Sequence, residues 1–312
     1  MTTTIISHPD CQEHTNGPGH PEQPARLPAV IDALMGLDQD GMVYEQADKG
    51  DVDAIKALHD AAYVDHILAS APAEGLNRLD PDTCMSPKSA DAALYGVGAA
   101  CRAVDLVMSG GAQNAFCATR PPGHHAETAK AMGFCLFGNV AIAAKYAEQK
   151  YGLTRIAVAD FDVHHGNGTQ DLLWSEANML FASSHEMPLY PGTGAASEVG
   201  AHNNIINMPL MSGATSAEFQ AAWEPTLKRF DDFKPELVFI SAGFDAHMLD
   251  PLAGLNLIEK DFAWITNQLC DLADKHASGR LVSVLEGGYN LDALASSAAT
   301  HVEILRSRGL AA

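Results

Sequence analysis

Residues 156–168 read IAVADFDVHHGNG and join a short apolar run to a turn crowded with carboxylate, imidazole and amide groups. The run Ile156–Ala159 predicts a short buried strand. Side chains two residues apart on a strand point to one face, so we expect Asp160, Asp162 and His164 to converge. Carboxylates and imidazoles held this close favour a divalent cation. The alternative is a polar, Gly-rich turn after a strand, because short motifs often match by chance.

The C-terminal two-thirds of the chain alternates short apolar runs with longer amphipathic stretches. This alternation is typical of a parallel sheet with helices on both faces, and no change of composition marks a second domain. We therefore expect residues 1–312 to form a single α/β domain with a central, mostly parallel sheet. The predicted strands are Ala115–Ala118, Ile156–Ala159, Met179–Ala182, Leu237–Ser241 and Leu281–Leu285. The predicted helices are Asn139–Lys150, Ser216–Phe230, Lys260–His276 and Leu291–Arg306.

Two stretches, residues 7–24 and 71–88, are rich in Pro and Gly and predict long loops, with a helix over about residues 25–37 after the first. Loops of this length in a compact domain are often functional.

The overall composition narrows the class of protein. Nineteen Lys and Arg against 39 Asp and Glu give a net charge of −20 over 312 residues. This charge repels nucleic-acid phosphates, so no direct nucleic-acid partner is expected. The acidity either attracts cationic substrates or serves only solubility.

Six cysteines at irregular spacings, with no C-x-x-C pair, indicate neither a zinc ribbon nor a disulfide framework. They are typical of thiols in a reducing cytosol. The N-terminus has no signal-peptide pattern and no apolar run approaches the length of a membrane span. We expect a cytoplasmic protein without a membrane partner.

An unusual loop follows each predicted strand. In open α/β sheets ligands bind beyond the carboxyl ends of the strands, so these loops should share one rim and form the active site. The five loops are residues 119–125 (TRPPGHH), 160–168 (DFDVHHGNG), 183–185 (SSH), 242–247 (AGFDAH) and 286–290 (EGGYN).

The predicted metal ligands are Asp162 and His164 from one loop and Asp245 from another. Three protein ligands leave a coordination position open, as in catalytic zinc sites. Zinc is favoured by this ligand set, with Fe(II) and Mn(II) as alternatives. Asp245 alone could be a polar strand cap, but Ala242 and Gly243 before it let the backbone approach a bound group closely.

Other polar side chains of the rim suit acid and base catalysis. His124 and His125 are candidates for proton transfer to and from a water at the metal, with Asp160 and Asn167 as their available partners. Tyr289 follows two glycines and can donate a hydrogen bond to a developing oxyanion. Its alternative role is packing.

Together these motifs resemble the histone deacetylase family, which has the arginase/deacetylase fold. With the region His20-Pro21-Glu22, they cover nearly the whole chain in order. The motifs are Arg120–His125 (RPPGHH), Gly133–Asn139 (GFCLFGN), Asp160–Gly168, Ser241–Ala246 (SAGFDA) with Asp250–Gly254 (DPLAG), and Leu285–Leu291 (LEGGYNL). Asn167 and the run from Glu286 to Tyr289 resemble class II and its bacterial histone deacetylase-like amidohydrolases more than class I.

The resemblance implies a zinc-dependent deacetylase that cleaves N-acyl groups from lysine side chains of proteins or from related small amides. It places Zn²⁺ on the predicted triad, pairs His124 with Asp160 and His125 with Asn167, and sets Tyr289 over the substrate carbonyl. His125 is then the general base and His124 mainly electrostatic. The implied substrate-binding residues are Gly133, Phe134, Tyr190, Leu252 and Asp82, with the first three lining a narrow tunnel.

The resemblance also implies structural K⁺. One ion is expected near Asp160, Asp162, His164, Ser183 and the carbonyl of Ser184. A second monovalent cation is expected at the carbonyls of Leu173, Glu176 and Met179. Bacterial relatives often form dimers or tetramers, so a homo-oligomer is a further expectation.

Three alternatives stay open. An acetylpolyamine amidohydrolase is weakened by Leu252, because polyamine-specific relatives carry Glu at the tunnel mouth, yet Asp80 or Asp82 could still attract a cation. An arginase-like ureohydrolase needs two bridged metals, and its chemistry has no place for Tyr289 or the paired histidines. A non-catalytic acyl-binding protein could keep the fold without the activity.

Overall fold

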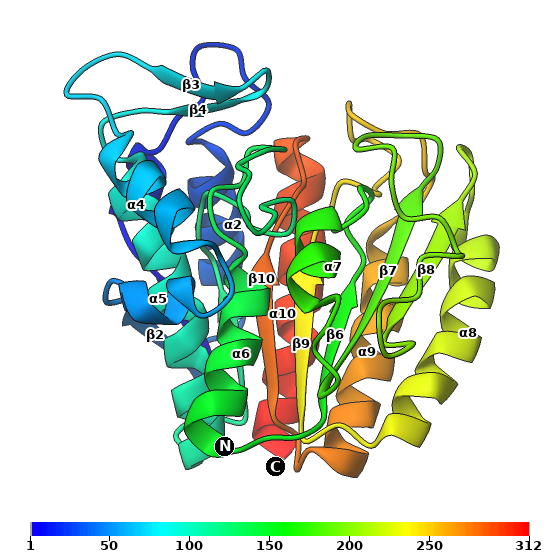
Figure 1. Cartoon of the computed structure of the whole chain (residues 1–312). Coiled ribbons are helices and arrows are strands. Elements are labelled where there is room, and N and C mark those ends of the chain that lie inside the picture. Colours follow the sequence, from blue (N-terminus) through cyan, green and yellow to red (C-terminus); the bar gives the residue numbers. More distant parts are fainter. Residues whose placement is uncertain (1, 312) are drawn as a thin grey trace.

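An eight-stranded sheet runs through the centre of the molecule in the computed structural model, which describes residues 2–311 (Figure 1). The strand order is β2-β1-β5-β10-β9-β6-β7-β8, and every neighbouring pair is parallel. The strands are β1 (Thr3–Ser7), β2 (Met42–Gln46), β5 (Asn114–Cys117), β6 (Ile156–Asp160), β7 (Met179–Glu186), β8 (Ile205–Leu210), β9 (Leu237–Ala242) and β10 (Leu281–Leu285).

Helices cover both faces of this sheet, as predicted. One face packs against α2 (Arg26–Met35), α8 (Ser216–Phe233), α9 (Glu259–His276) and α10 (Leu291–Ala311). The other packs against α5 (Ser89–Ser109), α6 (Asn139–Tyr151) and α7 (Asn167–Leu173). Successive residues of a strand point to opposite faces, so a strand covered on both sides must be apolar throughout. In β9, Val238 and Ile240 enter one cluster while Leu237 and Phe239 enter the other.

The predicted strands and helices are present, with ends that differ by a few residues. The largest difference is in β7, which continues to Glu186, so residues 183–185 lie inside the strand and do not form a loop after it. The cause is tertiary: β8 pairs with β7 from Phe181 to Glu186 and extends it beyond its apolar core. Four major elements were not predicted: β1, β2, β8 and α5.

The stretch 71–88, predicted as a long loop, contains an antiparallel hairpin of β3 (Asn77–Asp80) and β4 (Thr83–Met85). These strands are too short to show an alternating pattern in the sequence. The hairpin lies at the end of the molecule where the sheet strands have their carboxyl ends (Figure 1). Three short helices, α1 (Asp10–Glu13), α3 (Val52–Lys56) and α4 (Ala61–Ala69), complete the described chain.

Helix α5 is both long and apolar. Among residues 2–311 it alone is long and apolar enough to cross a membrane by composition, with a mean hydropathy of 1.3 over its most apolar window. The sequence-based expectation that no apolar run reaches this length was therefore wrong. In the fold, 61% of that window is buried, where Ala and Val side chains pack with α6 against the sheet. Its composition is accounted for by this core position.

Candidate active site

The register of the sheet brings the functional loops to one edge. Asp160, at the end of β6, pairs with Ser183 of β7 on one side and Ser241 of β9 on the other. The loops that follow β5, β6, β9 and β10 therefore start at nearly the same height. This is the shared rim predicted from the sequence, although residues 183–185 reach it as part of a strand.

Asp162, His164 and Asp245 lie together at this rim with their metal-binding atoms within 4.8 Å of one another. His164 Nδ1 is 3.2 Å from Asp162 Oδ1 and 3.1 Å from Asp245 Oδ2. In a tetrahedral zinc site with bonds of about 2.0–2.1 Å, ligand atoms stand about 3.3 Å apart. Two of the three separations in this buried triad are thus close to those in a site for a small divalent cation.

The charges of this triad also fit a cation. Burial and the charge of Asp162 raise the pKa of Asp245 to about 7. Burial opposes protonation of His164, but hydrogen bonds to Asp162 and Asp245 outweigh it and raise its pKa to about 10. Protons on Asp245 and His164 can therefore balance the buried charges. Because metal ligands bind in their deprotonated forms, a divalent cation can displace both protons.

Two glycines allow the carboxylates to approach each other. A Cβ on Gly243 would collide with the Asp162 side chain, and one on Gly287 would collide with both Asp245 and Asp162. The backbone N–H of Gly287 donates to Asp162 Oδ2 at 2.8 Å, and that of Val163 donates to Asp245 Oδ1 at 2.8 Å. These bonds aim one oxygen of each carboxylate toward His164.

A chain of hydrogen bonds fixes the tautomer of His125. Asn167 donates its Nδ2 to the carboxylate of Glu127 at 2.6 Å, so its Oδ1 faces His125. His125 Nδ1 must then carry the hydrogen that Oδ1 accepts at 2.6 Å. Nε2 is left with a free lone pair, which is what a general base requires. Glu127 was not predicted, although it follows His125 by only two residues.

His124 has the opposite electrostatic surroundings. Its Nδ1 is 3.0 Å from Asp160 Oδ2, and its Nε2 is 3.7 Å from Asp162 Oδ1. Burial alone would lower its pKa, but the charges of Asp162 and Asp160 hold the pKa well above the usual value. Burial, with His124 and His164 nearby, holds the pKa of His125 well below the usual value. One imidazole is therefore held protonated and its neighbour neutral, a division typical of acid and base pairs.

Tyr289 is held by residues from distant parts of the chain. Asp250 accepts the backbone N–H of Tyr289 at 2.7 Å. Arg26 donates to the backbone carbonyls of Glu286 and Gly288, each at 2.6 Å, and its guanidinium lies 5.0 Å from the Tyr289 ring centroid. Burial and the Asp245 charge raise the pKa of the phenol well above its usual value, so it remains a hydrogen-bond donor.

Glu286 links two of the loops and was quoted in a motif without a predicted role. Its Oε2 accepts the backbone N–H groups of Gly123 and His124 at 2.6 and 3.1 Å, and its Oε1 accepts Ser241 Oγ at 3.2 Å. Burial raises its pKa to about 7. Glu286 thereby fixes the backbone that carries the two histidines.

A cavity of about 240 Å³ leads to these groups. All five residues predicted to bind substrate line it: Gly133, Phe134, Tyr190, Leu252 and Asp82. His125, His164, Leu189 and Tyr289 complete its wall. The structure thus brings the predicted tunnel residues and part of the catalytic set together, while their individual roles stay predictions.

The β3–β4 hairpin shapes one wall of this cavity. Asp82 Oδ1 accepts the N–H of Gly133 at 3.2 Å, and Thr83 Oγ1 accepts the N–H of Phe134 at 2.9 Å. Phe134 has a φ of 70°, which is uncommon for a residue with a side chain. A Cβ on Gly133 would collide with the His125 ring. The hairpin thus holds the Phe134 turn against the His125 ring.

The residues predicted to hold K⁺ are buried near the same edge. Asp160, Asp162, His164, Ser183 and Ser184 all have little or no exposed surface. The carbonyls of Leu173, Glu176 and Met179 also converge as predicted, but a side-chain amide, that of Asn204, lies within hydrogen-bond distance of all three.

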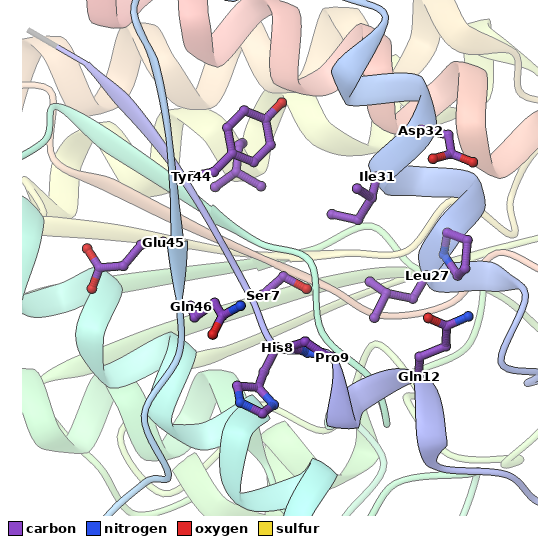
Figure 2. A pocket seen from close by; sticks show the side chains of 12 residues that line it. Ser7, His8, Pro9, Gln12, Leu27, Ile31, Asp32, Tyr44, Glu45 and Gln46 are labelled. Carbon is purple, nitrogen blue, oxygen red and sulfur yellow. The ribbon is translucent and has the colours of Figure 1, made fainter.

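A wider hollow of about 600 Å³ lies elsewhere, between α2 and strands β1 and β2 (Figure 2). Its floor includes the apolar side chains of Ile5 and Leu27. Of its two carboxylates, Glu45 is paired with Arg102 and Asp32 is exposed on α2. This hollow contains none of the predicted site residues.

A buried triad that could hold a metal ion lies beside one neutral and one protonated histidine, and its member His164 lines the cavity. This arrangement is typical of a metal-dependent hydrolase. Comparisons with known proteins identify its family. A family model described as a histone deacetylase domain matches residues 20–305. The chain is 37% identical to the histone deacetylase-like amidohydrolase of Pseudomonas aeruginosa, over 87% of this chain and 73% of that protein.

The chain is also 37% identical to type-2 histone deacetylase 2 of Dictyostelium discoideum, matching 93% of this chain but spanning only 20% of that longer relative. The solved structure of the HDA15 HD domain has a TM-score of 0.92 at 31% identity, covering 99% of this chain and 92% of that one. The chain therefore belongs to the histone deacetylase family and is a hydrolase acting on amides. The predicted family and fold are confirmed.

Proposed function

We propose that this protein is a zinc-dependent deacetylase that removes acyl groups from lysine side chains of proteins or from related small amides. The observation that carries this proposal is the buried triad Asp162, His164 and Asp245. Its member His164 lines a cavity whose wall also contains His125 and Tyr289. A divalent cation bound there would lower the pKa of a water and polarise the amide carbonyl.

The surrounding residues supply the proton transfers. His125 accepts a proton from the attacking water at Nε2 and returns it to the leaving amine. Its pKa, held well below the usual value, supports a neutral base. His124, whose pKa is held well above the usual value, stabilises the developing negative charge. Tyr289 donates a hydrogen bond to the oxyanion.

Exchanging Tyr289 for Phe tests that last role. We expect kcat to fall by about 10²–10³-fold, because one oxyanion donor is lost. The ring remains, so its packing against Phe134, with centroids 5.8 Å apart, is kept. Steady-state kinetics on an acetyl-lysine peptide give the value, and unchanged thermal stability shows that the fold is intact. A variant with wild-type kcat would assign Tyr289 to packing alone.

The cavity favours an unbranched stem that carries a terminal acyl group. Phe134 and Tyr190 bring aromatic surface to its wall, and Leu252 contributes an apolar side chain. These features support acyl-lysine as the substrate. Acetylpolyamines are the second candidate, because Asp82 lines the same cavity and the chain has a net charge of −20.

Competing substrates separate these candidates. We expect a higher kcat/KM for an acetyl-lysine peptide than for acetylspermidine or acetylputrescine, and loss of both activities with a zinc chelator. A Leu252→Glu variant is the matched test, since the added carboxylate should shift the ratio toward the polyamines. Higher kcat/KM on a polyamine with the unaltered protein would replace acyl-lysine as the substrate.

Two further assignments are part of the proposal. A structural K⁺ near Asp160 and Ser183 is supported by the convergence of these buried residues in the sheet register. A cytoplasmic location is supported by the six cysteines, which are all free thiols.

A further inference from the structure

Three backbone carbonyl oxygens and one buried amide meet at the turn between α7 and β7. Asn204, the residue before β8, places its Nδ2 2.9 Å from the oxygen of Leu173, 3.3 Å from that of Glu176 and 3.2 Å from that of Met179. Convergent carbonyl oxygens without a donor among them are a site for a hard cation. Here the space among them contains an N–H₂ group.

Two of these oxygens, those of Leu173 and Glu176, already accept a backbone hydrogen bond. A carbonyl oxygen has two lone pairs. Leu173 O accepts the N–H of Glu176 at 3.1 Å, and Glu176 O accepts the N–H of Met179 at 3.0 Å. Asn204 Nδ2 brings two N–H donors to within 3.3 Å of all three oxygens. A cation touching all three oxygens from this side would overlap the amide nitrogen.

The position of the Asn204 side chain is set from both ends. Its backbone carbonyl accepts the N–H of Phe181 at 2.9 Å, and its Oδ1 accepts the N–H of His202 at 3.3 Å. A Cβ on Gly200 would collide with Oδ1, so glycine makes room for the amide. The residue is 5% exposed. Turning the amide away would leave buried polar groups unpaired, at a cost of about 1–3 kcal/mol each.

We propose that the amide of Asn204 replaces a monovalent cation at this turn. The side chain fastens the end of α7 to the starts of β7 and β8 without an exchangeable ion. The consequence reaches the active site, because α7 begins with Asn167, the partner of His125. This attachment of α7 is then independent of the K⁺ concentration, and the second monovalent cation expected from the family is not bound.

Exchanging Asn204 for Asp provides the test. The two side chains have nearly the same shape, but the carboxylate cannot donate to the three carbonyls and repels them. The variant should therefore need a monovalent cation at this position. We expect its melting temperature to drop in choline chloride and to be restored by RbCl of equal ionic strength, with a larger Rb⁺ response than that of the unaltered protein.

The neighbouring exposed residue offers a matched control. Asn203→Asp adds the same charge one position away, on a side chain exposed to solvent. It should show the same Rb⁺ response as the unaltered protein. Equal responses of Asn204→Asp and Asn203→Asp would overturn the proposal.

Anomalous diffraction locates the ion directly. Crystals of the unaltered protein soaked in RbCl should show no anomalous peak among the carbonyls of Leu173, Glu176 and Met179, whereas Asn204→Asp crystals should show one. A peak there in the unaltered protein, with the Asn204 side chain turned away, would overturn the proposal even if the variant does not fold.

Discussion

Exchanging Asp245 for Asn is expected to lower amide hydrolysis by at least about 10³-fold and to abolish tight zinc binding. Asp245 supplies one of three ligand atoms within 4.8 Å of one another, and an amide oxygen brings no charge to the cation. Metal assistance contributes several kcal/mol to the transition state, which corresponds to about 10³-fold in rate. Turnover of an acetyl-lysine peptide and zinc content after dialysis measure the two effects.

The same variant should be more stable than the unaltered protein when both are metal-free at pH 8. The pKa of Asp245 in the fold is about 7, against an ordinary value of 3.8. Between these values the unfolded chain loses its proton first, so the unaltered protein loses stability as the pH rises, with the full cost above pH 7. Asn has no proton to lose. Its advantage should therefore grow between pH 5 and pH 8 in thermal unfolding.

Asp32→Asn is the matched control, because this carboxylate is exposed on α2. It should leave turnover, zinc content and the pH dependence of stability unchanged. An Asp245→Asn protein that retains zinc and turnover would remove Asp245 from the metal site. If the stability advantage of Asp245→Asn instead shrank as the pH rose, the raised pKa of Asp245 would be contradicted.

Exchanging His125 for Ala should lower kcat by about 10²–10⁴-fold, the range for loss of a positioned general base. Asn167 donates to Glu127 and accepts from His125 Nδ1, so His125 Nε2 carries a free lone pair. Zinc content should remain unchanged, since His125 is not a member of the triad. Single-turnover kinetics with the enzyme in saturating excess over the peptide separate the chemical step from binding.

His124→Ala is the comparison that assigns the roles. The pKa of His124 is held well above the usual value, so its imidazole is already protonated and cannot accept a proton from water. Its loss should therefore cost less than that of His125. If His125→Ala kept wild-type turnover while His124→Ala abolished it, the roles would be reversed. Free imidazole that restores activity to His125→Ala would support a direct proton transfer at that position.

Local patterns in the sequence predicted the parts of the fold whose physical cause is local. The central strands are buried on both faces, so β6, β9 and β10 read as apolar runs, and the polar loops after them mark the carboxyl edge of the sheet. The strands β1 and β2 were missed. In β2 the burial is incomplete because the strand lies at the edge of the sheet, and it lacks a continuous apolar run.

Within the site, too, local patterns predicted some features, whereas contacts between distant residues were missed. Asp162 and His164 were predicted to converge from strand geometry. They do converge, but β6 ends at Asp160 and both residues lie in the bend that follows it, so the stated reason was wrong. Arg26 is 262 residues from Gly288, whose carbonyl it binds, and no local pattern connects them. Glu127 was overlooked because its role depends on the orientation of the Asn167 amide, which becomes apparent only when all three side chains are placed.

The sequence by itself determined the family, the α/β fold and the residues that can bind a metal, because these follow from short motifs and from the periodicity of apolar residues. Only the tertiary structure decided the tautomer of His125, the support of Tyr289 by Arg26 and Asp250, and the presence of Asn204 where a cation was expected. The physical reason is that hydrogen bonds between distant residues depend on atomic positions to within a few tenths of an ångström. Those positions are set by the packing of the whole chain.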